Sequence, residues 1–201
     1  MPRPKQFNPD TALDAAVNLF WRNGYTATSI QQLVAAMGIN RFSLYDTFGD
    51  KHQLFVAALK RYWDQLTSQI LAPLYDHDAD LDQIKAFLDR LADRLTSPHG
   101  ERGCLITNTA AELSLHDEEV RLLVTDFLAE KERLIAAALT RGQRNGAVRT
   151  EKDPVGLARL LLCDLYGLTI INKARRDPAL VRQNISEIAS HLQNSPSTDS
   201  L

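Results

Sequence analysis

The feature that most constrains the fold is a helical repeat of apolar residues that runs through almost the whole chain. Leu13, Ala16, Val17 and Phe20 follow the i, i+3, i+4, i+7 spacing, and similar stripes recur as far as Leu192. Alternating runs of β-branched residues, which would predict a sheet, are too short to support one. The sequence therefore predicts an all-α protein.

The composition fits a protein that buries a real core. Of 201 residues, 44% are hydrophobic and 24% are charged, which is ordinary for a globular domain. The most apolar stretch, residues 155–171, contains Arg159 and Asp164, and the first ten residues lack the apolar core of a secretory signal. We therefore expect no membrane contact and a cytoplasmic location. Cys104 and Cys163 are too few for a disulfide framework.

Glycines and cap residues divide the start of the chain into short helices. Gly24 is expected to end the first helix, Thr28 to cap a second one, and Gly38 to end it. A third helix then follows over residues 41–48. Helix, tight turn and helix within residues 28–48 is the geometry that presents a short helix to the major groove of DNA.

The rest of the chain is expected to form a larger helical domain. Asp50 should cap a long fourth helix that ends near Pro73. We expect further helices over residues 81–95, 104–115, 117–144, 154–171 and 178–192. No linker rich in Gly, Ser or Pro separates the two halves. The expected division is a three-helix helix-turn-helix DNA-binding domain (1–50), a larger helical domain (51–193), to which the family resemblance described below assigns ligand binding and dimerisation, and a disordered tail (194–201).

The charge is distributed unevenly along the sequence. The chain carries a net charge of −2, but up to Tyr62 it has seven basic and four acidic residues, which gives +3 there and −5 in the remainder. A positive N-terminal segment is what phosphate binding at one end of the molecule would require.

Candidate DNA-binding residues follow from the expected helix-turn-helix. Its small core should consist of Leu33, Val34, Ile39, Leu44 and Phe48. The polar surface then carries Asn40, Arg41, Ser43 and Thr47. Arg41 can donate two hydrogen bonds to guanine, and Asn40 and Gln31 can reach base edges or phosphate.

Phosphate groups are the expected targets of three further side chains. Tyr45 and Thr47 supply hydroxyls and Lys51 supplies an ammonium group. Lys51 also lies beside the start of a helix, where free backbone N–H groups attract anions. Thr28 completes the predicted DNA-binding set.

The segment GYTATSIQQLVAAMGINRFSLYDTFGDKHQLF resembles the DNA-binding domain of TetR-family repressors. The family pattern is met by Gly24-Tyr25, Thr28-Ser29-Ile30, Ala35, Gly38-Ile39-Asn40, Leu44-Tyr45, Phe48, Asp50-Lys51 and Leu54. The resemblance implies a homodimer whose last two long helices form a four-helix interface, with an effector cavity in each larger domain. It also implies double-stranded operator DNA as the partner.

The same resemblance assigns roles within the DNA-binding set. Tyr45, Thr47 and Lys51 match positions that usually touch phosphate, whereas bases are usually read from the positions of Gln31, Arg41, Phe42 and Ser43. Phe42 departs from the small residue or proline common there. It either contacts a thymine methyl group or packs under its helix.

The predicted effector site rests on polar and aromatic residues within the larger domain: Phe87, Cys104, Asn108, Glu112, Asp164 and Tyr166. RGCLITNTAAEL, residues 102–113, is similar to the start of the sixth helix in a TetR subgroup that includes electrophile-responsive repressors. A thiol beside Arg102 at a helix start would favour the thiolate. The alternative reading is that Cys104 is a packed residue and the effector binds without covalent chemistry.

Other functions have less support in the sequence. Glycine-rich phosphate loops and the G-x-S-x-G and H-E-x-x-H motifs are missing, so we expect neither an enzyme nor a cofactor. Residues 116–119 are consecutive and point around a helix, which does not suit a metal ion. A helical interaction protein that does not bind DNA remains an alternative, as does an activator.

Overall fold

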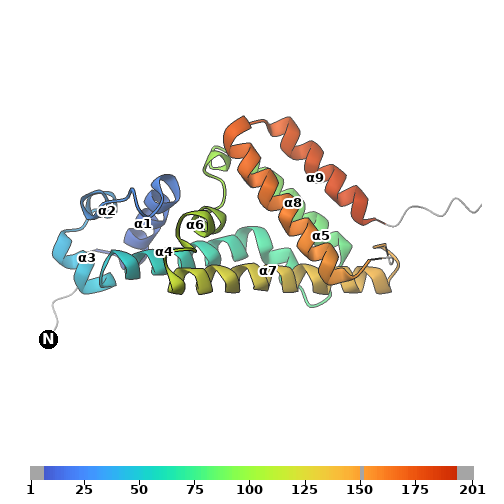
Figure 1. Ribbon diagram of the computed structural model, residues 1–201, viewed down its shortest axis with the longest axis horizontal. Coiled ribbons are helices and arrows are strands. Elements are labelled where there is room, and N and C mark those ends of the chain that lie inside the picture. Colours follow the sequence, from blue (N-terminus) through green and yellow to red (C-terminus); the bar gives the residue numbers. More distant parts are fainter. Residues whose placement is uncertain (1–6, 150–151, 194–201) are drawn as a thin grey trace, which may run out of the picture. The chain divides into compact units, whose positions relative to one another are not determined.

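The computed structural model describes residues 7–149 and 152–193. Within these ranges it consists of helices and turns with a single isolated β-bridge between Val148 and Gln193, which confirms the all-α prediction (Figure 1). The predicted disordered tail at 194–201 lies outside the described residues. Internal contacts divide the chain into two compact units. The first contains the chain up to Leu66 together with Cys104–Val124, and the second contains the remainder.

The first unit is built from helices α1 to α4, α6 and the first turns of α7. Their bounds are α1 Pro9–Asn23, α2 Ile30–Met37, α3 Arg41–Phe48, α4 Lys51–Leu66, α6 Leu105–Leu113 and α7 Glu118–Arg144. Helix α1 packs on α4 through aromatic side chains. The rings of Phe20 and Phe55 meet edge to face at 4.9 Å between centroids, and those of Trp21 and Tyr62 at 5.3 Å. This core supports the helix-turn-helix.

The ends of α1 and α2 show how local sequence sets the geometry. Gly24 ends α1 at φ 80° and ψ 175°, a conformation that is essentially restricted to glycine. The predicted cap of α2 was wrong by one residue. Ser29, not Thr28, caps the helix, because its hydroxyl accepts from the N–H of Gln32 while the Gln32 side chain accepts from the N–H of Ser29. Gly38 ends α2 in the left-handed conformation.

The predicted fourth helix is not regular over its whole length. After α4 the backbone continues as a π-helical segment, Thr67–Leu71, and then as a 3₁₀ turn, Ala72–Tyr75. Asp50 begins α4 as expected, since its carboxylate accepts from the N–H of Gln53 at 2.8 Å. The π-helical segment starts where the first compact unit ends.

The second unit contains α5, most of α7, α8 and α9. The bounds that have not yet been given are α5 Leu81–Thr96, a 3₁₀ turn Gly100–Arg102, α8 Pro154–Arg175 and α9 Pro178–Leu192. Helix α9 turns back alongside α8 and packs against α5 (Figure 1). A buried hydrogen bond of 2.9 Å joins the side-chain amide of Asn172 on α8 to the carbonyl of Leu95 on α5.

Helix α8 combines a buried side with an exposed apolar side. Leu161, Leu165 and Leu168 are buried, whereas Leu160 and Ile170 are 53% and 59% exposed. Among the described residues, α8 is the one helix that is long and apolar enough to cross a membrane. Its most apolar 18-residue stretch has a mean hydropathy of 1.5, and a third of that stretch is buried within the protein. Buried core helices pass the same test, so this is weak evidence for a membrane span.

Candidate DNA-binding surface

Helix α3 is held at its start by Asn40. The Asn40 side-chain oxygen accepts a hydrogen bond of 2.8 Å from the N–H of Ser43, which makes Asn40 the N-cap of α3. The residue was predicted to read base edges or phosphate with its side chain. Its oxygen accepts from the helix in this structure, so the amide NH₂ is the group that could donate to DNA.

Three large side chains dominate the exposed surface of α3. Phe42 is 78% exposed and Tyr45 is 41% exposed. Arg41 lies one turn before Tyr45, and its guanidinium carbon is 5.7 Å from the centre of that ring. The guanidinium also donates to the Tyr45 hydroxyl at 3.4 Å. Because Arg41 is already held against Tyr45 in the free protein, it should lose less conformational entropy when it binds DNA.

The other residues predicted for this surface differ in how exposed they are. Gln31 on α2 is exposed and Ser43 is half-buried. Thr28 is only 1% exposed, and its hydroxyl donates to the carbonyl of Gly24 at 2.6 Å, so it braces the loop and is not on the surface. The Thr47 hydroxyl is also buried, and a phosphate contact would require the side chain to rotate.

Lys51, the first residue of α4, points toward the aromatic ring of Tyr25. The Lys51 ammonium nitrogen lies 4.2 Å from the ring centre, which is within cation–π distance. Burial lowers the pKa of Lys51, and the nearby carboxylate of Glu112 partly offsets this effect. The ammonium group predicted to contact phosphate therefore already lies against an aromatic ring of the protein and near a carboxylate.

Glu112, near the end of α6, holds the loop between α1 and α2. Its two carboxylate oxygens accept hydrogen bonds of 3.1 Å from the N–H of Tyr25 and 2.8 Å from the N–H of Thr26. Burial alone would raise the pKa of Glu112, but these hydrogen bonds and Lys51 together bring it below its ordinary value. Glu112 was predicted to bind the effector. In this structure its carboxylate is hydrogen-bonded to the α1–α2 loop, and effector binding by Glu112 stays a prediction.

A second carboxylate, Asp117, joins the start of α7 to the start of α4. One of its oxygens lies 2.7 Å from Nε2 of His52, and the other accepts from the N–H of Val120 at 3.0 Å. Burial raises the pKa of Asp117, but these two contacts outweigh burial and lower it overall. The corner between α6 and α7 therefore contacts both the α1–α2 loop and α4.

The remaining effector candidates belong to both compact units. Phe87 and Tyr166 lie in the second unit, where Phe87 is 1% exposed and the Tyr166 ring lies 4.9 Å from the ammonium nitrogen of Lys131. Cys104 and Asn108 lie in the first unit. Cys104 is the half-buried N-cap of α6, as the sequence predicted, and its side chain makes no capping hydrogen bond.

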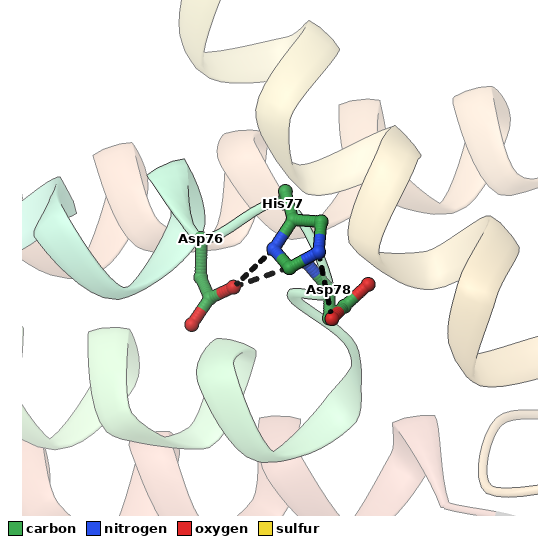
Figure 2. Close-up of side chains that lie close together, drawn as sticks. All are labelled: Asp76, His77 and Asp78. Atoms are coloured by element: carbon green, nitrogen blue, oxygen red, sulfur yellow. Dashed lines mark hydrogen bonds and ion pairs between the residues drawn. The ribbon is translucent and has the colours of Figure 1, made fainter.

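A small cluster of charged side chains lies in the loop after the 3₁₀ turn. Figure 2 shows the imidazole of His77 between two carboxylates, with 3.4 Å to Asp76 and 3.0 Å to Asp78. All three residues are exposed, and the Asp76 carboxylate also accepts from the N–H of Asp78. Exposed clusters of this kind are common without an ion, and we assign no metal to this one.

A capped α3 that displays Arg41, Phe42 and Tyr45 beyond a glycine-bearing turn defines a helix-turn-helix regulator that reads DNA. Comparisons with known proteins agree. The family model for bacterial regulatory proteins of the tetR family matches residues 12–58, and that for the tetracyclin repressor-like C-terminal domain matches residues 81–188. The chain belongs to the TetR family and is a DNA-binding transcriptional regulator.

Individual relatives support the same conclusion. The chain is 33% identical over 169 residues to the HTH-type transcriptional repressor ComR of Escherichia coli, which covers 84% of this chain and 80% of ComR. It is 30% identical to the uncharacterized HTH-type regulator YezE of Bacillus subtilis, with 88% and 92% covered. A cysteine mutant of the TetR family regulator CifR, solved in complex with 26-bp operator DNA, superimposes with a TM-score of 0.84 at 29% identity, with 94% and 99% covered.

Proposed function

We propose that this protein is a cytoplasmic repressor that binds a pseudo-palindromic operator as a homodimer and is released by a small-molecule effector. The observation that carries the DNA-binding part is the exposed surface of α3, where Arg41, Phe42 and Tyr45 lie together beyond the capped helix start. A dimer would place two α3 helices about one turn of DNA apart, roughly 34–36 Å.

Gel-shift titrations with the promoter regions of the protein's own gene and its neighbours test this proposal. Arg41→Ala should weaken binding by about 1–3 kcal/mol, roughly 5- to 150-fold, if Arg41 contacts guanine. Lys51→Ala should weaken binding to all sequences and reduce the salt dependence by about one counterion. Arg133→Ala on α7 is the matched control, because that exposed side chain pairs with Glu130 at 2.8 Å. Unchanged binding by both variants would favour an interaction protein that does not read DNA through this face.

The homodimer is proposed to form through α8 and α9. The exposed side of α8 presents Leu160, Ile170 and Ile171 together with the exposed thiol of Cys163. A groove of about 270 Å³ adjoins it and is lined by Leu157 and other residues of α8 and α9. Exposed apolar side chains on one helix are costly in water, and a second copy of the same helix would cover them.

Light scattering during size-exclusion chromatography tests the dimer. Leu160→Asp should convert the dimer to a monomer, because it places a charge in the apolar contact. Leu115→Asp is the control, since Leu115 is 92% exposed and belongs to the other compact unit, just after α6. A wild-type monomer, or a dimer that persists in Leu160→Asp, would contradict the proposed interface.

A thiol switch at Cys104 is the second candidate for release. The thiol lies at the start of α6, where unpaired backbone N–H groups favour a negative charge. An electrophile such as N-ethylmaleimide should then release operator DNA from the wild-type protein but not from Cys104→Ser. Equal release of both proteins would leave only noncovalent effectors.

A further inference from the structure

Phe42 is exposed to an extent that packing does not explain. It lies in the first turn of α3 and is 78% exposed, whereas Leu44 in the same helix is fully buried. Packing under the helix, one of the two readings that the sequence allowed, is therefore excluded in this structure. Single exposed apolar side chains are common on protein surfaces, so what distinguishes Phe42 is its place on the helix that presents Arg41 and Tyr45 to DNA.

The surroundings of Phe42 specify what kind of ligand. Arg41 precedes it, and Tyr45 lies one turn further along the same exposed side of α3. A guanidinium and a phenol suit phosphate oxygens and base edges. The apolar group that Phe42 contacts must therefore belong to the duplex that these polar groups bind.

Only one base presents an apolar group in the major groove. Guanine, cytosine and adenine present hydrogen-bond donors and acceptors there, whereas thymine presents its C5 methyl group. We propose that Phe42 reads the C5 methyl group of a thymine in the operator. Phe42 is then a specificity-determining residue that requires a thymine, or another 5-methylpyrimidine, at the position facing the first turn of α3. This inference rests on the proposed binding of DNA through α3.

The test removes the methyl group without changing the base pairing. A tight-binding duplex is first selected from random sequences with the full-length wild-type protein. Each thymine is then replaced in turn by deoxyuridine, which pairs with adenine identically. Wild type should lose about fourfold in affinity for one critical thymine, the value of one buried methyl group. Phe42→Ala should bind the thymine and deoxyuridine duplexes equally at that position.

Two further variants sharpen the outcome. Phe42→Leu keeps an apolar side chain and should retain part of the preference for thymine. Leu115→Ala removes an apolar side chain that is even more exposed, 92% against 78% for Phe42, from another part of the chain and should leave the preference unchanged. The inference is overturned if no thymine behaves differently between wild type and Phe42→Ala. If the selection yields no specific duplex, or if Arg41→Ala binds the selected one as wild type does, the proposed function itself fails.

Discussion

Replacing Glu112 should loosen the loop between α1 and α2 and lower the stability of the first compact unit. In Glu112→Ala the N–H groups of Tyr25 and Thr26 lose a charged acceptor. Hydrogen bonds to charged groups contribute about 1.5–3 kcal/mol each when buried. Because the N–H of Thr26 is exposed and water can replace its partner, we expect a total loss of about 1.5–3 kcal/mol. Glu112→Gln keeps one acceptor oxygen and should lose less.

The pH dependence of this loss is also fixed by the structure. The folded-state pKa of Glu112 lies below its ordinary value, so folding favours the ionised form. The contribution is therefore fully present above the ordinary glutamate pKa and disappears as the pH falls through the folded-state value. The difference in unfolding free energy between wild type and Glu112→Gln should shrink accordingly on acidification.

Urea unfolding at several pH values measures this difference, and hydrogen exchange reports on the two N–H groups directly. Exchange at Tyr25 and Thr26 should accelerate in Glu112→Ala. Glu118→Gln provides the control, because it removes the same charge from an exposed pair with Arg121 at the same corner. The reasoning is refuted if Glu112→Ala matches wild type in stability at neutral pH and in exchange at both positions.

Three other changes probe separate parts of the molecule. Asn40→Ala should cost about 1 kcal/mol of stability by removing the cap of α3, and Asn40→Asp should restore it in urea unfolding. Asp117→Ala should cost about 1–2 kcal/mol, since it loses both the α7 cap and His52, and the loss should vanish in acid because the folded-state pKa of Asp117 is lowered. Phe87→Ala should cost about 3–5 kcal/mol in thermal unfolding, as expected of a core residue; a change in effector binding without such a loss would contradict this.

Most of the helical framework could be predicted from the sequence because its signals are local. Gly24 and Gly38 end helices as expected, and residues 41–48 form α3 with the predicted bounds. The error at Thr28 arose because Thr28 and Ser29 can both cap a helix. Gln32 decides in favour of Ser29, since only a residue three positions before it can complete the reciprocal capping box. The π-helical turn after α4 gave no comparable signal.

The candidate site could be predicted only in part. Exposure of Phe42 follows from helical periodicity once Leu44 faces the core, because the two residues lie on opposite sides of α3. Exposure of Arg41 does not follow in this way, since Arg41 is three residues before Leu44 and a helix places such residues on one side. The role of Glu112 could not be found this way, because its hydrogen-bond partners lie 86 and 87 residues away in the sequence. For the same reason, the pairing of His52 with Asp117 depends on tertiary packing.

The tight approach of Glu112 to Gly24 has an evolutionary consequence. A Cβ atom added at Gly24 would lie 2.7 Å from a carboxylate oxygen of Glu112, in addition to the strain of placing a side chain at φ 80°. The two positions are therefore expected to covary. Homologues with a larger residue in place of Gly24 should have a shorter or uncharged residue in place of Glu112. Homologues that keep the glycine but lack the carboxylate should hold the α1–α2 loop through other hydrogen bonds.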